Sequence, residues 1–252
     1  VTLVNPNLVQ PGITPYALDI LTTSLEQNGF DVHVVDLTFQ RERWRSVLRK
    51  YFAMHEPLLV AFTIRNTDTI YPQEQRVFLE SHLEIINLVK RLTDAPLIAG
   101  GVGFSSMPFA LLDYFGLDYG VKGPGEIILA NLANQLHRGE SPEQIPGLLI
   151  RNGADIHQVP GTYNLWGQNP LSQEDRFLTV NQTTPYRRRS STPYKVDNLQ
   201  YYQNGGLGNF IAKNGCAFGC THCVEPDAKG VLFFKRQAEA VVDELELLAA
   251  QG

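Results

Sequence analysis

Short apolar runs alternate with helical patterns along the first 140 residues. The runs predict five strands, at 1–6, 31–37, 57–64, 95–101 and 118–123. Helical periodicity follows them at about 15–28, 43–52, 79–89 and 125–139. Strands that alternate with helices are typical of a parallel sheet with crossover connections. The pattern therefore predicts an α/β fold, a doubly wound Rossmann-like domain over residues 1–140.

The first helix carries clear signals at both ends. Thr14 is expected to be the N-cap, with Pro15 at the first helical position, where its missing N–H costs nothing. Asn28-Gly29 is expected to close the helix, because glycine adopts the left-handed conformation without strain.

The pattern changes after residue 140. A short strand pair turned by Asn152-Gly153 is expected, followed by a stretch rich in Pro, Asn, Gln, Tyr and Ser, and we interpret 141–205 as a linker. Residues 206–215 then predict a new strand, and 236–252 an amphipathic helix. The chain opens at Val1 within a strand and closes where another element would follow, so we expect it to be part of a longer protein.

Composition narrows the class of protein. The 252 residues are 43% hydrophobic and 19% charged, as in ordinary soluble globular proteins. A net charge of −5 argues against a nucleic-acid partner, and the arginine-rich run at 186–195 is interpreted as a solvated loop. The sequence shows no apolar run long enough for a spanning helix and no signal peptide at its start, so no membrane partner is expected. Three clustered cysteines do not suit a secreted disulfide framework, and a cytoplasmic location is expected.

All three cysteines lie in "NGCAFGCTHC" (214–223), with the spacing Cys-x3-Cys-x2-Cys. Three thiolates on one loop can hold three corners of a 4Fe-4S cluster and leave the fourth iron open. The alternatives are a structural zinc and three unrelated buried cysteines. Zinc needs four ligands, and the adjacent His222 and Cys223 can hardly both reach one ion.

The sequence "GCAFGCTHC", after a strand and before a helix with "VVDELELLAAQG", resembles the opening unit of the radical S-adenosylmethionine enzymes. The resemblance implies that Cys216, Cys220 and Cys223 bind a 4Fe-4S cluster whose open iron is chelated by S-adenosylmethionine. It implies a partial (βα) barrel that begins at residues 206–252, and an electron donor such as flavodoxin or ferredoxin. Relatives often carry an aromatic residue near the adenine, where this chain has His222.

A Rossmann-like domain ahead of this motif resembles the cobalamin-binding subclass of that family. The resemblance implies cobalamin contacts from the loops that follow the strands: Asn5, Thr63, Arg65, Gly100, Gly101, Gly123, Gly125 and Glu126. The chemistry agrees, because small residues at strand ends let a flat macrocycle approach the backbone. The helix that begins near Glu126 also offers free N–H groups to polar atoms of the ligand.

No histidine is expected on cobalt. The motif Asp-x-His-x-x-Gly that supplies one belongs in the loop after the first strand, and that loop (5–15) has no histidine. Asp31-Val32-His33 lies instead within the second predicted strand, so His33 is interpreted as a strand residue. Arg65 could project beneath the corrin and disfavour a lower axial water, or pair with Asp68 or another carboxylate.

The subclass most often transfers a methyl group from S-adenosylmethionine, through methylcobalamin, to an unactivated carbon or phosphorus of a small-molecule or peptide substrate. The resemblance therefore predicts a methyltransferase. A cobalamin-dependent cyclase or rearrangement enzyme and a non-catalytic cobalamin or iron–sulfur sensor stay open as alternatives. Asp36 ends the second strand where a nicotinamide enzyme would bind ribose, but the first loop lacks Gly-x-Gly-x-x-Gly.

Overall fold

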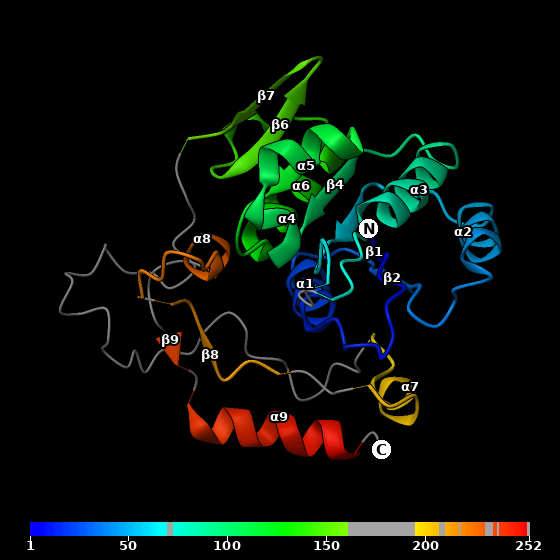
Figure 1. Cartoon of the computed structure of the whole chain (residues 1–252). Helices are drawn as coiled ribbons and strands as arrows, with labels where there is room; N and C mark the ends of the chain where they lie inside the picture. The colour runs from blue at the N-terminus through cyan, green and yellow to red at the C-terminus, as the bar shows by residue number, and fades with distance from the viewer. Residues whose placement is uncertain are drawn as a thin grey trace.

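The computed structural model (Figure 1) describes residues 1–69, 73–160, 195–206, 210–216, 218–229, 234–235 and 237–250. The N-terminal half alternates strands and helices. Its elements are β1 (Thr2–Asn5), α1 (Tyr16–Gln27), β2 (His33–Asp36), α2 (Trp44–Phe52), β3 (Val60–Thr63), α3 (Leu79–Lys90), β4 (Leu97–Gly100), α4 (Val102–Ser106), α5 (Pro108–Phe115), β5 (Tyr119–Val121) and α6 (Glu126–Arg138).

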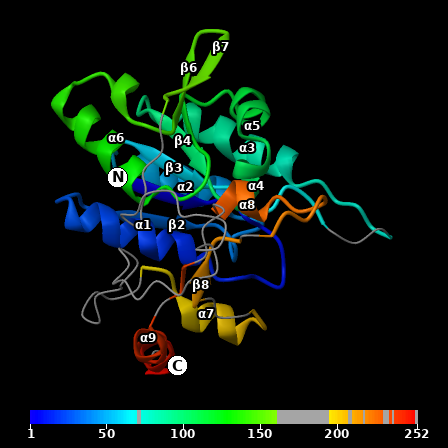
Figure 2. The same ribbon diagram turned by 90° about the vertical axis from the view of Figure 1, so that its left-hand side faces the viewer.

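These strands form a sheet that is covered on both faces. The order is β2-β1-β3-β4-β5-β6-β7, and the first five strands in the chain are parallel. Helices α1 and α6 lie against one face, and α2, α3 and α5 against the other (Figure 2). Strands β1 and β3 are buried along their whole length, since a central strand between two helix layers contacts no water.

The predicted α/β class is confirmed, with differences in detail. Helix α1 begins at Tyr16 with Pro15 at the N-cap, so the cap lies one residue later than predicted and makes no side-chain cap hydrogen bond. The helix does end at Asn28 and Gly29, and Gly29 has a φ of +86°. Helices α4 and α5, between β4 and β5, were not predicted.

The predicted strand pair is present, but it belongs to the sheet. After a 3-10 turn at η1 (Pro142–Gln144), β6 (Leu148–Asn152) pairs antiparallel with β5 and turns into β7 (Asp155–Gln158). Leu148 and Leu149 are fully buried in the two cores. The stretch interpreted as a linker thus starts with two strands of the sheet, and its residues 161–194 lie outside the described part. The other domain boundaries stay a prediction.

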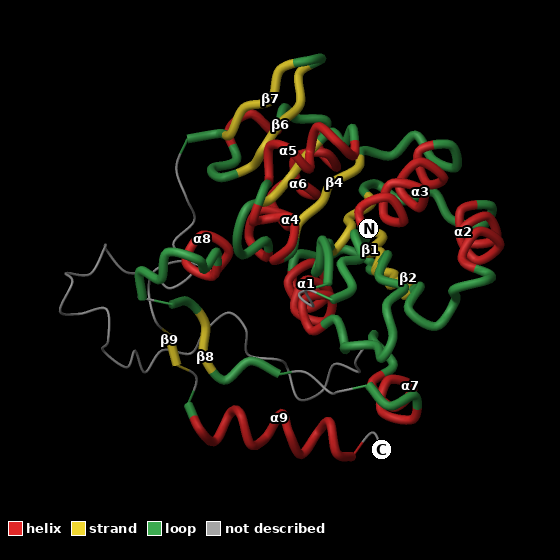
Figure 3. The backbone as a smooth tube through the Cα atoms, viewed as in Figure 1, coloured by secondary structure: helices red, strands yellow, loops and turns green. Residues whose placement is uncertain are grey.

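The C-terminal part has α7 (Asn198–Gln203), β8 (Lys213–Asn214), α8 (Glu225–Lys229), β9 (Phe234–Lys235) and α9 (Ala238–Ala250). Strands β8 and β9 form a separate antiparallel pair (Figure 3). The strand predicted at 206–215 is therefore described only at 213–214, and residues 207–209 lie outside the described part. The predicted helix is present as α9, with Val242 and Leu245 exposed and Glu244 buried.

Candidate functional site

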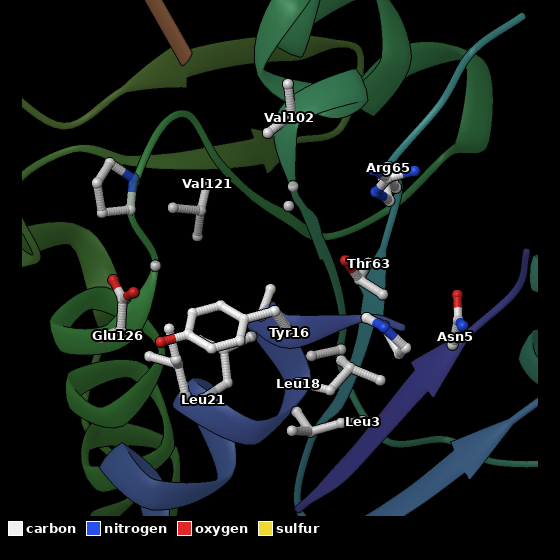
Figure 4. A pocket seen from close by; sticks show the side chains of 18 of the residues that line it. Leu3, Asn5, Tyr16, Leu18, Leu21, Thr63, Arg65, Val102, Val121 and Glu126 are labelled. Carbon is white, nitrogen blue, oxygen red and sulfur yellow. The ribbon is translucent and has the colours of Figure 1, made fainter. Parts of the chain in front are cut away.

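A cavity of about 670 Å³ opens at the carboxyl ends of β1, β3, β4 and β5 (Figure 4). In doubly wound sheets, ligands bind where neighbouring strands send their helices to opposite faces. Strands β1 and β3 form such a point here, because α1 covers one face of the sheet and α3 covers the other. The topology therefore places the cavity where a ligand is expected.

The residues predicted from the strand ends surround this one cavity. Those that line it are Asn5, Thr63, Arg65, Gly100, Gly101, Gly123, Gly125 and Glu126. His222, which was predicted near the adenine of S-adenosylmethionine, is exposed on the cysteine loop and does not line the cavity. Their roles toward a cofactor stay a prediction, but the fold brings eight of the nine predicted positions together.

Asn5 lines the cavity, while its amide group is held from behind. Its Nδ2 donates to Asp36 Oδ1 and Thr38 Oγ1, both at 3.0 Å, and its Oδ1 accepts the backbone N–H of Asn7 at 3.2 Å. The residue is only 2% exposed. Asn5 therefore fixes the loop after β1 and has little capacity left to bind a ligand through its side-chain N–H groups.

Gly100, which ends β4, and Gly101, which follows it, are glycines for two different physical reasons. Gly101 has a φ of +102°, and a Cβ there would lie 2.7 Å from the carbonyl oxygen of Ile64, at the end of β3. Only glycine permits that backbone conformation and that close approach. Gly100 is less constrained, because a Cβ there would meet its nearest atom, on Val121, at 3.7 Å. At Gly100 the small residue only leaves space beside the cavity.

Arg65 extends beside Thr63 from the end of β3 (Figure 4). Its guanidinium donates to Asn66 Oδ1 at 3.2 Å, and burial lowers its pKa from the usual value. Within the described ranges, no carboxylate forms an ion pair with it, so the pairing with Asp68 is not formed. The side chain thus brings a positive charge to the edge of the cavity.

One wall of the cavity was missed by sequence reasoning. Helix α1 presents Tyr16, Leu18 and Leu21 to it (Figure 4). The periodicity that identified this helix marks an apolar face, but it cannot distinguish a face that packs on the core from one that lines a cavity. The wall is apolar, as expected for a site that takes a large ligand with a hydrophobic surface.

The C-terminal part of the chain closes the cavity from the other side. The lining residues from this part are Phe210, Ile211, Ala212 and Lys213, which precede the cysteine loop, with Ala228 and Lys229 of α8, which follows it. Lys229 Nζ forms an ion pair with Glu225 Oε2 at 2.5 Å on the same helix. The cavity therefore lies between the sheet and the segments that flank the cysteines.

His33 and Asp36 have structural roles. The His33 ring donates a hydrogen bond to Asp31 Oδ2 at 3.0 Å and lies against the rings of His55 and Tyr51, outside the cavity lining. The Asp36 carboxylate accepts from Asn5, from the backbone N–H of Thr38 and from the Tyr201 hydroxyl. Asp36 is thus already occupied and is not available to bind a ribose.

The three cysteines share one loop and form no disulfide. Cys216 and Cys223 are partly buried, Cys220 is exposed, and the N–H of Cys223 donates to the carbonyl of Cys220 at 3.2 Å. No three His, Cys, Asp or Glu side chains gather into a metal-ligand group within the part of the chain that the structure describes. Three soft thiol donors on one loop fit an iron–sulfur cluster, and metal binding itself organises such ligands, so the cluster assignment stays a prediction.

No helix within the described ranges has the length and the apolar composition that crossing a membrane requires.

An α/β sheet with a cavity at its switch point is typical of doubly wound ligand-binding domains. Residues 9–133 match the B12 binding domain family. The whole chain aligns with tryptophan 2-C-methyltransferase from Streptomyces laurentii at 49% identity, over 47% of that protein. It superposes with a TM-score of 0.86 and 52% identity on the radical S-adenosylmethionine methyltransferase TsrM from Kitasatospora setae, solved with cobalamin and a [4Fe-4S] cluster. All of this chain is covered, and 47% of that one.

A second structure of TsrM from Kitasatospora setae, with tryptophan and a S-adenosylmethionine analogue, also gives a TM-score of 0.86. The cobalamin-dependent radical enzyme OxsB matches at a TM-score of 0.72 and 16% identity, which supports the shared fold. The chain belongs to the cobalamin-binding radical S-adenosylmethionine enzymes, as the cysteine loop and the strand-end residues indicated. It spans about half the length of the relatives that it matches.

Proposed function

We propose that the protein to which this chain belongs is a cobalamin-dependent radical S-adenosylmethionine methyltransferase. The observation that carries the proposal is the cavity of about 670 Å³, which is lined both by the strand ends of the B12-binding fold and by residues that flank the cysteine loop. A methyl carrier in this cavity would lie next to the loop that is predicted to hold the cluster. Identity of 49% to tryptophan 2-C-methyltransferase supports the same activity.

The residues of the cavity fit cobalamin. Gly100, Gly123 and Gly125 leave the backbone accessible at the strand ends, and α1 supplies an apolar wall. When bound, cobalamin supplies a carrier that accepts a methyl group from S-adenosylmethionine and passes it to carbon. None of the described residues that line the cavity is a histidine. This supports the proposal that no protein histidine ligates the cobalt.

Arg65 is proposed to lie beneath the corrin. The guanidinium stays protonated under physiological conditions and cannot act as a ligand, so it would disfavour a lower axial water. Its half-buried place at the cavity edge, without a carboxylate partner in the described part of the chain, supports this role.

Cys216, Cys220 and Cys223 are proposed to ligate a 4Fe-4S cluster, which supplies an open iron and electron transfer for S-adenosylmethionine. His222 would lie near the adenine. An electron donor of the flavodoxin or ferredoxin type would reduce the cluster, and the expected compartment is the reducing cytoplasm.

The proposed substrate is tryptophan or a small molecule that carries an indole. The support is the name of the Streptomyces laurentii relative, which acts at carbon 2 of tryptophan, and the tryptophan bound in the Kitasatospora setae structure. A peptide that contains tryptophan is the alternative substrate.

The test uses full-length protein, purified without oxygen and loaded with iron and cobalamin. Incubation with tryptophan and methyl-deuterated S-adenosylmethionine should give a product that carries the CD3 group, together with S-adenosylhomocysteine. Cys220→Ala should abolish this product, and Thr221→Ala, on the same exposed loop, should keep it. A cyclase would need both cofactors and keep the label out of the product, while a sensor would consume no S-adenosylmethionine.

A further inference from the structure

Residues 195–206, which we name the strap, are bound to helix α1 and to the ends of strands β1 and β2. At its start, the N–H groups of Lys195 and Val196 donate to Asp19 Oδ1 of α1 at 3.1 and 3.3 Å. Lys195 Nζ also lies 3.3 Å from Glu26 Oε1 on the same helix. Helix α7 forms the centre of the strap. The strap is therefore held on α1 before it reaches the strand ends.

Tyr201 of α7 provides the second attachment and is 1% exposed. Its hydroxyl donates to Asp36 Oδ2 at 2.6 Å and lies 2.9 Å from Thr38 Oγ1. It also accepts from Asn5 Nδ2 at 3.3 Å. Burial and the neighbouring Asp36 raise the pKa of the Tyr201 phenol, so the hydroxyl stays a donor. One side chain thus joins the strap to the ends of β1 and β2.

The ring of Tyr201 also packs on the loop after β1. A Cβ on Gly12 would lie 2.9 Å from the ring, so this loop closes directly on the tyrosine. Phe39 meets the ring edge-on at a centroid distance of 4.7 Å. The N–H of Gly206 donates to the carbonyl of Tyr201 at 2.8 Å, and Gly206 itself packs on the carbonyl of Gly12. Tyr201 therefore contacts both the β1 loop and the start of the chain that continues toward the cysteines.

Both neighbours of Tyr201 lead to walls of the cavity. The β1 loop contributes Asn7, Ile13 and Thr14 to the lining. The chain after Gly206 contributes Phe210–Lys213 and then enters the cysteine loop. Tyr201 is not one of the residues that line the cavity, and its hydroxyl binds Asp36, Thr38 and Asn5. Tyr201 can act on the site only through the position of these two walls.

We propose that Tyr201 is a positioning residue: its hydrogen bond to Asp36 fixes the β1 loop and the strap together, and so sets the spacing between the cavity and the cysteine loop. The inference that this spacing serves cobalamin rests on the proposed function. The contacts of Tyr201 with Asp36, Thr38 and Asn5 do not depend on it.

The test compares Tyr201→Phe with Tyr202→Phe in the full-length protein. Tyr202 is the next residue of α7 and is 70% exposed, so its variant controls for the loss of a tyrosine hydroxyl on the same helix. Tyr201→Phe removes the donor to Oδ2 of the partly buried Asp36 carboxylate, while Oδ1 keeps its donors from Asn5 and Thr38. We expect amide hydrogen exchange in 195–206 and in the β1 loop to become roughly tenfold faster, and cobalamin affinity to fall roughly tenfold.

Two further measurements separate positioning from general loss of stability. The absorption spectrum of bound cob(II)alamin should shift in Tyr201→Phe, and kcat should fall more than KM rises, because the two walls are misplaced. Ile86→Val, in the opposite core, should lower the melting temperature and leave cobalamin affinity and the spectrum unchanged. Adding Asp36→Asn to Tyr201→Phe should cause little further loss, since the Oδ2 atom of Asp36 has already lost its donor from Tyr201.

The proposal is overturned if Tyr201→Phe and Tyr202→Phe give the same exchange rates and the same cobalamin affinity. It is also overturned if exchange accelerates while affinity and spectrum stay at wild-type values, because the strap would then be irrelevant to the cavity. Failure of the proposed function has a different signature: wild-type protein would take up no cobalamin, and the exchange rates alone would decide whether Tyr201 fastens the strap.

Discussion

Replacing Gly101 with alanine tests whether the cavity depends on backbone geometry at the strand ends. Gly101 has φ +102° and ψ 170°, a region open essentially only to glycine. An added Cβ would lie 2.7 Å from the carbonyl oxygen and 3.1 Å from the carbonyl carbon of Ile64. Since these atoms belong to the backbone of Ile64, directly after β3, they cannot rotate away as a flexible side chain could.

The expected loss of unfolding free energy in Gly101→Ala has two contributions. Holding a residue other than glycine in this conformation costs about 1–3 kcal/mol. Forcing an extra carbon into a packed site costs about 1–3 kcal/mol more. The sum, about 2–6 kcal/mol, is a large share of the roughly 5–15 kcal/mol that stabilises a typical domain. If the protein stays folded, the loops after β3 and β4 must separate, and cobalamin affinity should fall with stability.

The neighbouring glycine provides the matched control. Gly100→Ala would place its Cβ 3.7 Å from Val121, at ordinary contact distance, and should change the unfolding free energy by less than about 1 kcal/mol. Urea denaturation followed by circular dichroism, and cobalamin titration of the full-length protein, measure both effects. Equal stability of Gly101→Ala and Gly100→Ala would refute the reasoning from backbone geometry.

Three further predictions concern the cluster, the cobalt and the pH dependence. Cys223→Ala should lower iron from about four per chain to nearly none in anaerobically purified full-length protein, and full iron content would remove this cysteine from the ligand set. Arg65→Ala should alter the spectrum of bound cob(II)alamin and slow turnover more than Arg65→Lys does, and wild-type spectra and rates in both would exclude a role beneath the corrin. Burial lowers the pKa of His82 to about 4 from 6.5, so the unfolded state binds the proton more readily and stability falls as pH drops from 6.5 toward 4, by up to about 3 kcal/mol. Urea denaturation at several pH values should show a flatter profile for His82→Gln, and parallel profiles would contradict the prediction.

Local pattern was enough to predict much of the fold. A strand buried between two helix layers has to be apolar throughout, so the runs around Thr2–Asn5 and Val60–Thr63 were identifiable without a structure. Helices α4 and α5 were missed because they are short. Pro108 and Gly116, which bound α5, suggest a loop as readily as a helix.

The site was predicted only where a residue type itself carries the signal. Gly101 and Gly123 stand out because glycine after a strand suggests close approach of the backbone or a ligand. Tyr16 gives no such signal, since an aromatic residue on a helix is equally suited to a core. Its place at the cavity depends on the sheet order, which puts α1 beside the ends of β3 and β4.

Three features could be predicted from the order of the residues alone: the alternation of strands and helices, the glycines at the strand ends and the spacing of the three cysteines. Each of these depends on residues close together in the chain. Three others depend on the folded chain: β6 and β7 extend the sheet, Tyr201 reaches Asp36 and Asn5, and residues 210–213 close the cavity. These contacts join residues as many as 196 positions apart, as between Asn5 and Tyr201, and they form only because burying the two helix layers brings the strand ends to one edge.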